Sequence, residues 1–247
     1  MTDPEIAANA VKFRTDLPVT FSNNVTAIVN TSSDKIDQAY ARSTTLQAWR
    51  SFVLEGQLGD GAMGFFAEAQ NDGLTSIALV TGGLWRSSLK SLRSLLENML
   101  HAFYYADHPV EYRLWEKGAF RISFQKLFEY FETHPDMQKL PSELSVMSDL
   151  KKHYGQLSKV VHASAKDVRM TNDLSKSQIW KTSKGDIGKW STLHNAVIRD
   201  INLLALILFK DHLAGAKAKG LREAIALVVP SSKDAIVKST FGVTLLR

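Results

Sequence analysis

Hydrophobic residues recur at helical spacing along most of the chain. Between residues 75 and 105, six large apolar side chains share one face of a helical wheel: Trp85, Leu89, Leu92, Leu96, Met99 and Phe103. A second apolar seam follows steps of three and four through Met147, Leu150, Tyr154, Leu157 and Val161. A third stretch, residues 186–213, contains the run INLLALILF and predicts a long, mostly buried helix. Because strand patterns are scarce, the sequence predicts a mainly α-helical fold.

The same pattern predicts three parts along the chain. Residues 1–30 contain the only strand-like stretch, FSNNVTAIVN, and we expect an irregular N-terminal arm there. Residues 31–213 carry the helical periodicity and are expected to form a helical bundle domain, whose first helix has Ser32 or Ser33 as its N-cap. Residues 214–247 are expected to form a C-terminal extension of short helices.

One glycine motif resembles a nucleotide-binding loop in its spacing alone. Gly59, Gly61 and Gly64 match G-x-G-x-x-G. That motif holds a dinucleotide only between a strand and a helix, and the segment before Gly59 has helical periodicity. We therefore interpret it as a loop that connects two helices. The sequence also lacks the phosphate-binding loop of NTPases and the nucleophile elbow of α/β-hydrolases.

Composition restricts the environment and the chemistry. The 247 residues include no cysteine, which excludes disulfides, thiolate metal sites and cysteine nucleophiles, and is typical of a reducing cytoplasm. The longest apolar run has nine residues, whereas a membrane-spanning helix needs about 20. The N-terminus lacks the basic and apolar regions of a signal peptide. We expect a cytoplasmic protein that does not enter a membrane.

The charge is divided unevenly along the chain. Residues 1–150 contain 13 Lys and Arg against 18 Asp and Glu, whereas residues 151–247 contain 17 against 7. The basic excess is densest between residues 151 and 189, where nine basic residues accompany three acidic ones. Such a region can attract RNA or DNA, or it can be a solvated lysine face.

The histidines give no metal signature. None of the seven forms an H-E-x-x-H or H-x-H motif, so we expect no metal and no cofactor. His162, in the stretch YGQLSKVVHASAKD, lies at the border of the apolar seam of its helix, beside Lys151, Gly155, Ser158 and Lys166. A histidine at such a border can act as a general acid or base, or it can bond a neighbouring carboxylate and complete the helix.

A charged stripe marks the helix between residues 75 and 105. Arg86, Lys90, Arg93, Glu97 and His101 follow steps of four, three, four and four. Most stripes of this kind are ladders of i, i+4 ion pairs on a solvated face. Because the rest of this helix is so apolar, Arg93 and Glu97 are alternatively expected to face a polar cleft shared with a neighbouring helix.

The order of three segments resembles the HEPN-like superfamily of bacterial helical proteins. These segments are RSSLKSLRSLLENMLHAFYYADHP, YGQLSKVVHAS and NAVIRDINLLALILF, and the similarity covers roughly residues 75–213. The resemblance implies an antiparallel helical bundle, a homodimer, and action on RNA in a toxin–antitoxin, CRISPR-linked or phage-defence system. Many members are metal-independent ribonucleases, and a partner protein from the same operon is then expected.

The resemblance also implies roles for particular residues. The family signature places an arginine four to six residues before a histidine; His162 matches the histidine, whereas the arginine positions hold Gly155, Gln156 and Leu157. In a ribonuclease His162 would be the general acid and base, Arg93 and Lys159 would stabilise the phosphate, and Glu97 would orient the cation or the histidine. The expected RNA-binding residues are Lys151, Lys152, Lys159, Lys166 and Arg169.

Three functions follow from these observations. The first is a ribonuclease-like effector with His162, Arg93 and Glu97 as catalytic residues. The second is a non-catalytic helical module that binds nucleic acid or a partner protein, which the missing arginine favours. The third is a sensor of a nucleotide or another small molecule in a pocket between helices.

Overall fold

The computed structural model describes residues 4–162 and 183–247, and every regular element among them is helical. The prediction of a mainly α-helical fold is therefore confirmed. The elements in chain order are α1 (Pro4–Trp49), the π-helical turn η1 (Arg50–Leu54), α2 (Glu55–Gln57), α3 (Asp60–Thr81), α4 (Trp85–Asp107), α5 (Pro109–Glu116), α6 (Phe124–Thr133), the 3-10 turns η2 (Pro135–Met137) and η3 (Ser142–Leu144), α7 (Met147–His162), α8 (Lys184–Leu208), the 3-10 turn η5 (Lys210–His212), α9 (Lys219–Val228), the 3-10 turn η6 (Ser231–Lys233) and α10 (Asp234–Phe241).

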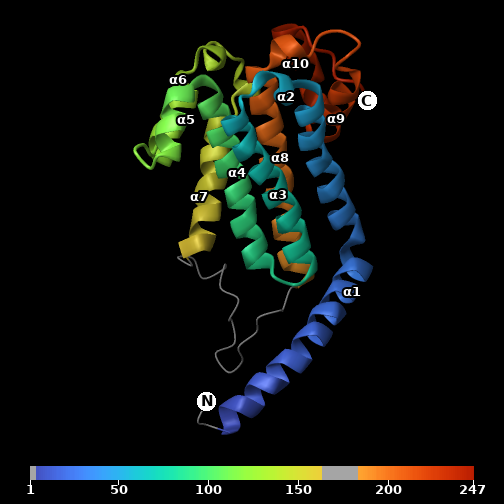
Figure 1. Cartoon of the computed structure of the whole chain (residues 1–247). Helices are drawn as coiled ribbons and strands as arrows, with labels where there is room; N and C mark the ends of the chain where they lie inside the picture. The colour runs from blue at the N-terminus through green and yellow to red at the C-terminus, as the bar shows by residue number, and fades with distance from the viewer. Residues whose placement is uncertain (1–3, 163–182) are drawn as a thin grey trace.

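Helix α8 lies at the centre of the bundle and contacts α1, α4, α7 and α9 (Figure 1). Its second half, residues 200–207, is buried on every side. This burial explains the INLLALILF run, because a helix enclosed by other helices needs no polar face. Helices α3 and α4 form the most extensive pair next to it.

Two hydrogen-bonded ties fix the helices of this core. The indole Nε1 of Trp49 donates to Oδ1 of Asn202 at 2.8 Å, and the amide of Asn202 donates to Thr45 at 2.9 Å. At the other end of the bundle, Trp190 Nε1 donates to Ser76 Oγ at 3.1 Å. These bonds satisfy polar groups that would otherwise be buried without partners, so they join α1 and α3 to α8 in a single register.

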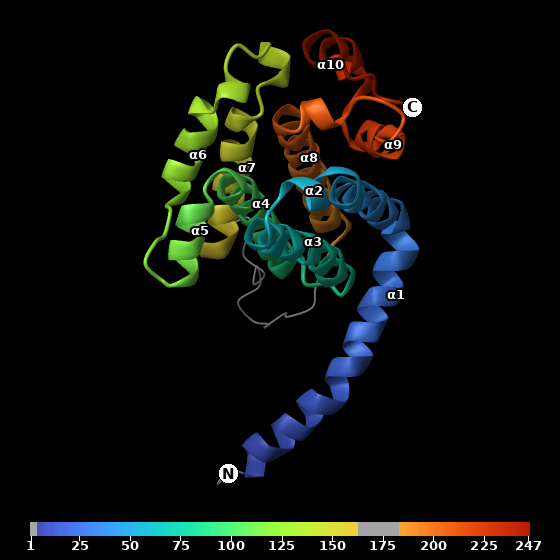
Figure 2. The same cartoon turned by 45° about the horizontal axis from the view of Figure 1, so that its top comes forward.

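The prediction of an irregular arm over residues 1–30 is wrong for the residues that are described. Residues from Pro4 onward belong to α1, which continues to Trp49 through a kink at Ser32, where φ is −148° and ψ is 25°. The N-terminal part of α1 projects away from the bundle in both views (Figures 1 and 2). No residue from Pro4 to Ala27 is buried.

An apolar stripe accounts for the helical arm. Ile6, Ala10, Phe13, Leu17 and Phe21 follow steps of four, three, four and four, which is the spacing of one helix face. The β-branched and asparagine residues between 19 and 30 have low helix propensity, which is why this stretch resembles a strand in the sequence. Propensity is a weak guide, since regular spacing and packing override it.

The glycine motif lies almost entirely inside α3. Gly59 is the N-cap of α3, and Gly61 and Gly64 belong to its first two turns. A Cβ atom at Gly61 would lie 2.2 Å from the ring of Tyr112, so glycine here permits close packing of α5 on α3. The connection between α2 and α3 is thus shorter than predicted, and the motif has a packing role.

The expected C-terminal extension does contain short helices. Helix α9 packs against α1 and α8, and Val228, Val229 and Val237 are buried in the common core. Residues 214–247 therefore complete the bundle rather than forming a separate unit. Across the described ranges, no helix combines the length and the apolar character that crossing a membrane requires.

Candidate functional site

Arg93 and Glu97 lie on α4 and form an ion pair. Nε of Arg93 donates to Oε1 of Glu97 at 2.7 Å, and Nη2 donates to the hydroxyl of Tyr154 on α7 at 2.9 Å. The guanidinium also lies 5.0 Å from the centre of the Tyr154 ring, which stacks on Phe124. With 17% and 23% of the two side chains exposed, this is a half-buried polar contact between α4 and α7.

The ion pair changes the acidity of Glu97 less than burial does. Burial raises the pKa of Glu97, and the neighbouring Arg93 opposes that rise. The charges of Arg93 and Glu97 largely neutralise each other, so the pair offers little net charge to a phosphate.

His162 lies elsewhere on α7. It is the last residue of the helix and is exposed. Tyr154, the partner of Arg93, lies eight residues earlier, which corresponds to about 12 Å along the helix. The arginine of α4 that extends to this end of α7 is Arg86, whose Nε donates to the carbonyl of Val160 at 3.3 Å. The structure therefore brings Arg93 and Glu97 together but leaves His162 apart from them.

The expected RNA-binding lysines separate into two groups. Lys151 forms an ion pair with Glu132 of α6 at 2.6 Å, so its charge is already neutralised. Lys152 and Lys159 point to another side of α7, where they line a groove. Lys166 and Arg169 lie outside the described residues.

This groove, which we call the lysine groove, runs between α7 and α8 and past the start of α4. Its volume is about 740 Å³. Trp85, Leu89, Val160 and Leu193 supply apolar lining, and Lys152, Lys159 and Lys189 supply charge. The remaining lining residues are His153, Gln156, Gly188, Thr192 and Ala196, so no carboxylate lines the groove. The three lysines form no ion pair within residues 4–162 and 183–247.

A buried ionic network supports the wall of the lysine groove. Nε2 of His153 donates to Oδ2 of Asp200 at 2.9 Å. Arg199 donates to both oxygens of the same carboxylate, at 2.6 Å and 3.0 Å. The hydrogen bond and the charge of Asp200 raise the pKa of Arg199. Since Asp200 is only 1% exposed, the charge of Arg199 and the hydrogen bond from His153 are both needed to compensate its burial. The network fixes α7 to α8 and thereby fixes the width of the groove.

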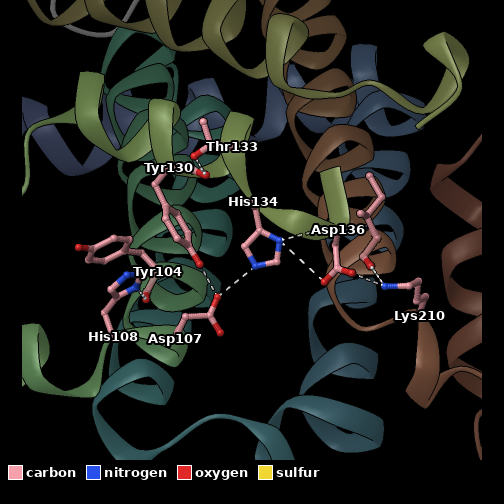
Figure 3. Close-up of polar contacts among 9 residues, drawn as sticks. Tyr104, Asp107, His108, Tyr130, Thr133, His134, Asp136 and Lys210 are labelled. Carbon is pink, nitrogen blue, oxygen red and sulfur yellow. Dashed lines mark hydrogen bonds and ion pairs between the residues drawn. The ribbon is translucent and has the colours of Figure 1, made fainter. Parts of the chain in front are cut away.

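A second polar network connects helices at the opposite end of the bundle (Figure 3). The Tyr130 hydroxyl donates to Oδ2 of Asp107, and Nε2 of His134 lies 3.3 Å from the same oxygen. The backbone N–H of Asp136 donates to Nδ1 of His134 at 3.2 Å, while Lys210 binds the Asp136 carboxylate at 2.7 Å. The chain of contacts thus connects α4 and α6 to the segment after α8.

The geometry of this network favours a structural role. Because Nδ1 of His134 accepts a hydrogen bond, the proton of the neutral ring is on Nε2 and faces Asp107. Both ring nitrogens therefore have partners. Burial and the bond to Asp107 raise the pKa of Tyr130, which keeps that hydroxyl protonated. Asp107 is 18 residues from Leu89 on α4, about 27 Å along the helix, so the network is remote from the lysine groove.

Sequence reasoning missed three residues of the groove and its support. Lys189 is the last residue of the basic region 151–189, so the sequence shows its charge but not its position in the groove. Asp200 interrupts the most apolar helix of the chain, and a lone acid in such a helix indicates a buried partner. His153 gave no signal of its own, since its partner is 47 residues away.

No metal site accompanies these groups. Within the described ranges, no cluster of three or more histidine and carboxylate side chains is arranged to hold a metal ion. Comparison of the chain with protein-family models, curated proteins and solved structures found no match.

Proposed function

We propose that the protein is a non-catalytic module that binds single-stranded RNA in the lysine groove. The observation that carries the proposal is a concave site of about 740 Å³ with an apolar lining and three lysines that have no acidic partner among the described residues. A site of this size, mostly apolar with a few convergent polar groups, is the usual form of a ligand pocket.

The two kinds of lining residue match the two parts of a nucleotide. Lys152, Lys159 and Lys189 supply positive charge for phosphates, and such contacts provide most of the affinity of non-specific nucleic-acid binding. The apolar lining at Trp85, Leu89 and Val160 suits unstacked bases, which single strands expose and duplexes do not.

The positions of the expected catalytic residues favour binding over cleavage. The Arg93 guanidinium donates to Glu97 and Tyr154, and His162 lies about 12 Å away along α7. General acid–base catalysis needs the histidine and the phosphate-binding cation at one scissile bond. Arg93, Glu97 and His162 do not meet at such a point.

Fluorescence anisotropy with a labelled 12-nucleotide oligouridylate tests this proposal. We expect the wild-type protein to bind it, and the variant Lys152→Ala/Lys159→Ala/Lys189→Ala to bind much more weakly. In a salt titration, the triple variant should lose about 2 units of the slope of log K against log salt, because each phosphate contact to a single strand contributes about 0.7.

A matched control separates the groove from total charge. Lys117→Ala/Lys126→Ala/Lys238→Ala removes the same charge from three exposed lysines outside the groove, and we expect it to keep most of the affinity. Equal weakening by both triple variants would show that binding depends on net charge alone, and the groove would then not be the site.

A second candidate function is favoured by one contact. The bond from Arg86 to the Val160 carbonyl brings an arginine to the last turn of α7, close to His162. This pair could serve a metal-independent ribonuclease in which His162 is the general acid and base and Arg86 binds the phosphate. Incubation of wild-type and His162→Ala protein with total RNA and tRNA in EDTA decides between the two functions, since only the second predicts cleavage by the wild type alone.

The resemblance to HEPN-like proteins gives the proposal its biological setting. We propose a homodimer that works in the cytoplasm within a bacterial defence or toxin–antitoxin system, with a partner protein from the same operon. Light scattering on the purified protein tests the dimer: a mass near twice 27.5 kDa is expected, and a mass near 27.5 kDa at all concentrations would contradict it.

A further inference from the structure

A second basic pocket lies on the other side of the exposed stripe of α8. Its volume is about 580 Å³, and three arginines from three parts of the chain line it: Arg42 of α1, Arg199 of α8 and Arg247. The other lining residues are Thr192, Asn195, Ala196 and the segment 226–230, so no carboxylate lines this pocket either. We call it the arginine pocket.

The arginine pocket adjoins the lysine groove. Thr192 and Ala196 line both of them, and these two residues lie one turn apart on α8. Lys189 lies before the pair and Arg199 after it, so basic residues occur at both ends of one helix stripe. Arg199 follows Lys189 by ten positions, which corresponds to about 15 Å along the helix. Small side chains at 192 and 196 leave a low saddle between the two basic sites.

The three arginines differ in what they can offer a ligand. Arg247 donates to Asp234 and to the carbonyls of Ala226 and Val229, so it forms a fixed wall. Arg199 uses Nε and Nη2 on Asp200.

The guanidinium of Arg42 has no hydrogen bond or ion pair with any residue of the described ranges. Burial and the nearby charge of Arg199 both lower the pKa of Arg42, which is the effect of a cation that lacks an anion. An anion in the arginine pocket would relieve this repulsion.

We propose that the arginine pocket is a second phosphate site for the same nucleic-acid strand, with Arg42 as its principal anchor. A strand that leaves the lysine groove crosses the saddle at Thr192 and Ala196 and places a later phosphate against Arg42. Because the bases of this strand are unstacked, each nucleotide covers more than the roughly 3.4 Å of a stacked strand, so the distance of about 15 Å between Lys189 and Arg199 corresponds to at most about four nucleotides. A guanidinium suits this task, because its planar fork matches two oxygens of a phosphate. This inference rests on the function proposed for the lysine groove.

Strand length provides the test. A uridine trinucleotide without terminal phosphates has only two phosphates, one nucleotide apart, so these cannot bridge two sites that lie about 15 Å apart, whereas a 12-nucleotide strand can occupy both sites together. We expect Arg42→Gln to lower the ratio of the 12-mer affinity to the trinucleotide affinity by about tenfold, the effect of one lost charged hydrogen bond. Direct titration with labelled 12-mer oligouridylate and competition with unlabelled uridine trinucleotide supply the two affinities.

Arg50→Gln is the matched control. Arg50 directly follows α1 and pairs with Glu55, but it lines neither basic site, so the affinity ratio should stay at the wild-type value. A thermal melt of each variant establishes that it is folded.

The outcomes separate the two proposals. An unchanged ratio in folded Arg42→Gln, whether both affinities fall together or neither falls, overturns the second site and leaves the lysine groove intact. A wild-type protein that binds neither strand overturns both proposals. A ratio that falls in Arg42→Gln and not in Arg50→Gln supports the extended site.

Discussion

The imidazole of His153 and the carboxylate of Asp200 lie 2.9 Å apart, and together they join α7 to α8. The His153 ring forms part of the wall of the lysine groove, whereas Asp200 belongs to the core. A buried hydrogen bond in this place fixes the distance between the two helices that hold the three lysines. The groove and the core are therefore mechanically connected.

This connection predicts the effect of Asp200→Asn. Removing the buried charge takes from Arg199 its nearest carboxylate and from His153 its charged acceptor, and the free energy of unfolding should fall by about 3–5 kcal/mol. Urea denaturation followed by circular dichroism measures the change. Asp211→Asn, at an exposed position in η5, is the control and should change the free energy by less than about 0.5 kcal/mol. Equal stability of the two variants would show that Asp200 is not a structural charge.

Tyr154→Phe should separate stability from RNA binding. The substitution removes the acceptor of the Arg93 bond in a half-buried contact, and we expect a loss of about 0.5–1.5 kcal/mol in the free energy of unfolding. Tyr154 does not line the lysine groove, so the 12-mer affinity of the folded variant should equal that of the wild type. A large loss of 12-mer affinity in a folded variant would show that Arg93 and Tyr154 belong to the binding site.

His194 makes stability depend on pH. It is fully buried in α8, with Ser43 Oγ 3.3 Å from its Nε2, and burial lowers its pKa from 6.5 to about 4. Between pH 6.5 and 4 the unfolded chain binds a proton at this histidine and the folded chain does not. Stability from this group is therefore complete above pH 6.5 and is lost as the pH falls.

The expected size of this effect follows from linkage. Each unit of pKa difference corresponds to about 1.4 kcal/mol, so the free energy of unfolding should decrease by about 2 kcal/mol between pH 7 and pH 5 through His194 alone. We expect the pH dependence of His194→Gln to be smaller by this amount. His212→Gln, at an exposed position, should keep the wild-type dependence. Identical pH profiles for wild type and His194→Gln would contradict the assignment.

Deleting residues 1–20 should leave the bundle folded. No residue of α1 before Ile28 is buried, and the deletion keeps Phe21, whose ring lies where a side chain at Gly82 would be. We expect the melting temperature to change by less than about 2 °C, since almost no apolar surface is exposed by the deletion. A collapse of the melting transition would show that the arm contributes to the core.

The fold was predictable where a helix is buried on several sides. The run 201–209 has no polar face, and as expected its residues 201–208 form the end of α8, which α1, α4, α7 and α9 surround. The prediction of an irregular N-terminal arm was wrong because the residues between 19 and 30 individually favour strands, whereas the apolar stripe from Ile6 to Phe21 has helical spacing. Spacing was the more reliable signal of the two.

The candidate site could be predicted only in part, because helix register is not local information. The sequence places Arg93 and His162 on adjacent helices, but the antiparallel packing of α4 on α7 aligns Arg93 with Tyr154 and Arg86 with Val160. The same limit applies to the lysines. Lys151 and Lys152 are neighbours in sequence, and their positions relative to α6 and α8 give one an acidic partner and the other a place in the groove.

The kink at Ser32 also has a geometric consequence for the reach of the molecule. Pro4 precedes Ser32 by 28 positions along α1, so the tip of the segment lies about 42 Å from the bend. At that radius, a rotation of about 10° at Ser32 displaces the tip by about 7 Å. The two backbone angles of Ser32, the single non-helical residue of α1, thus set the direction of the arm. A small change in them moves Phe13 and Ile6 much further than a side-chain rotation would.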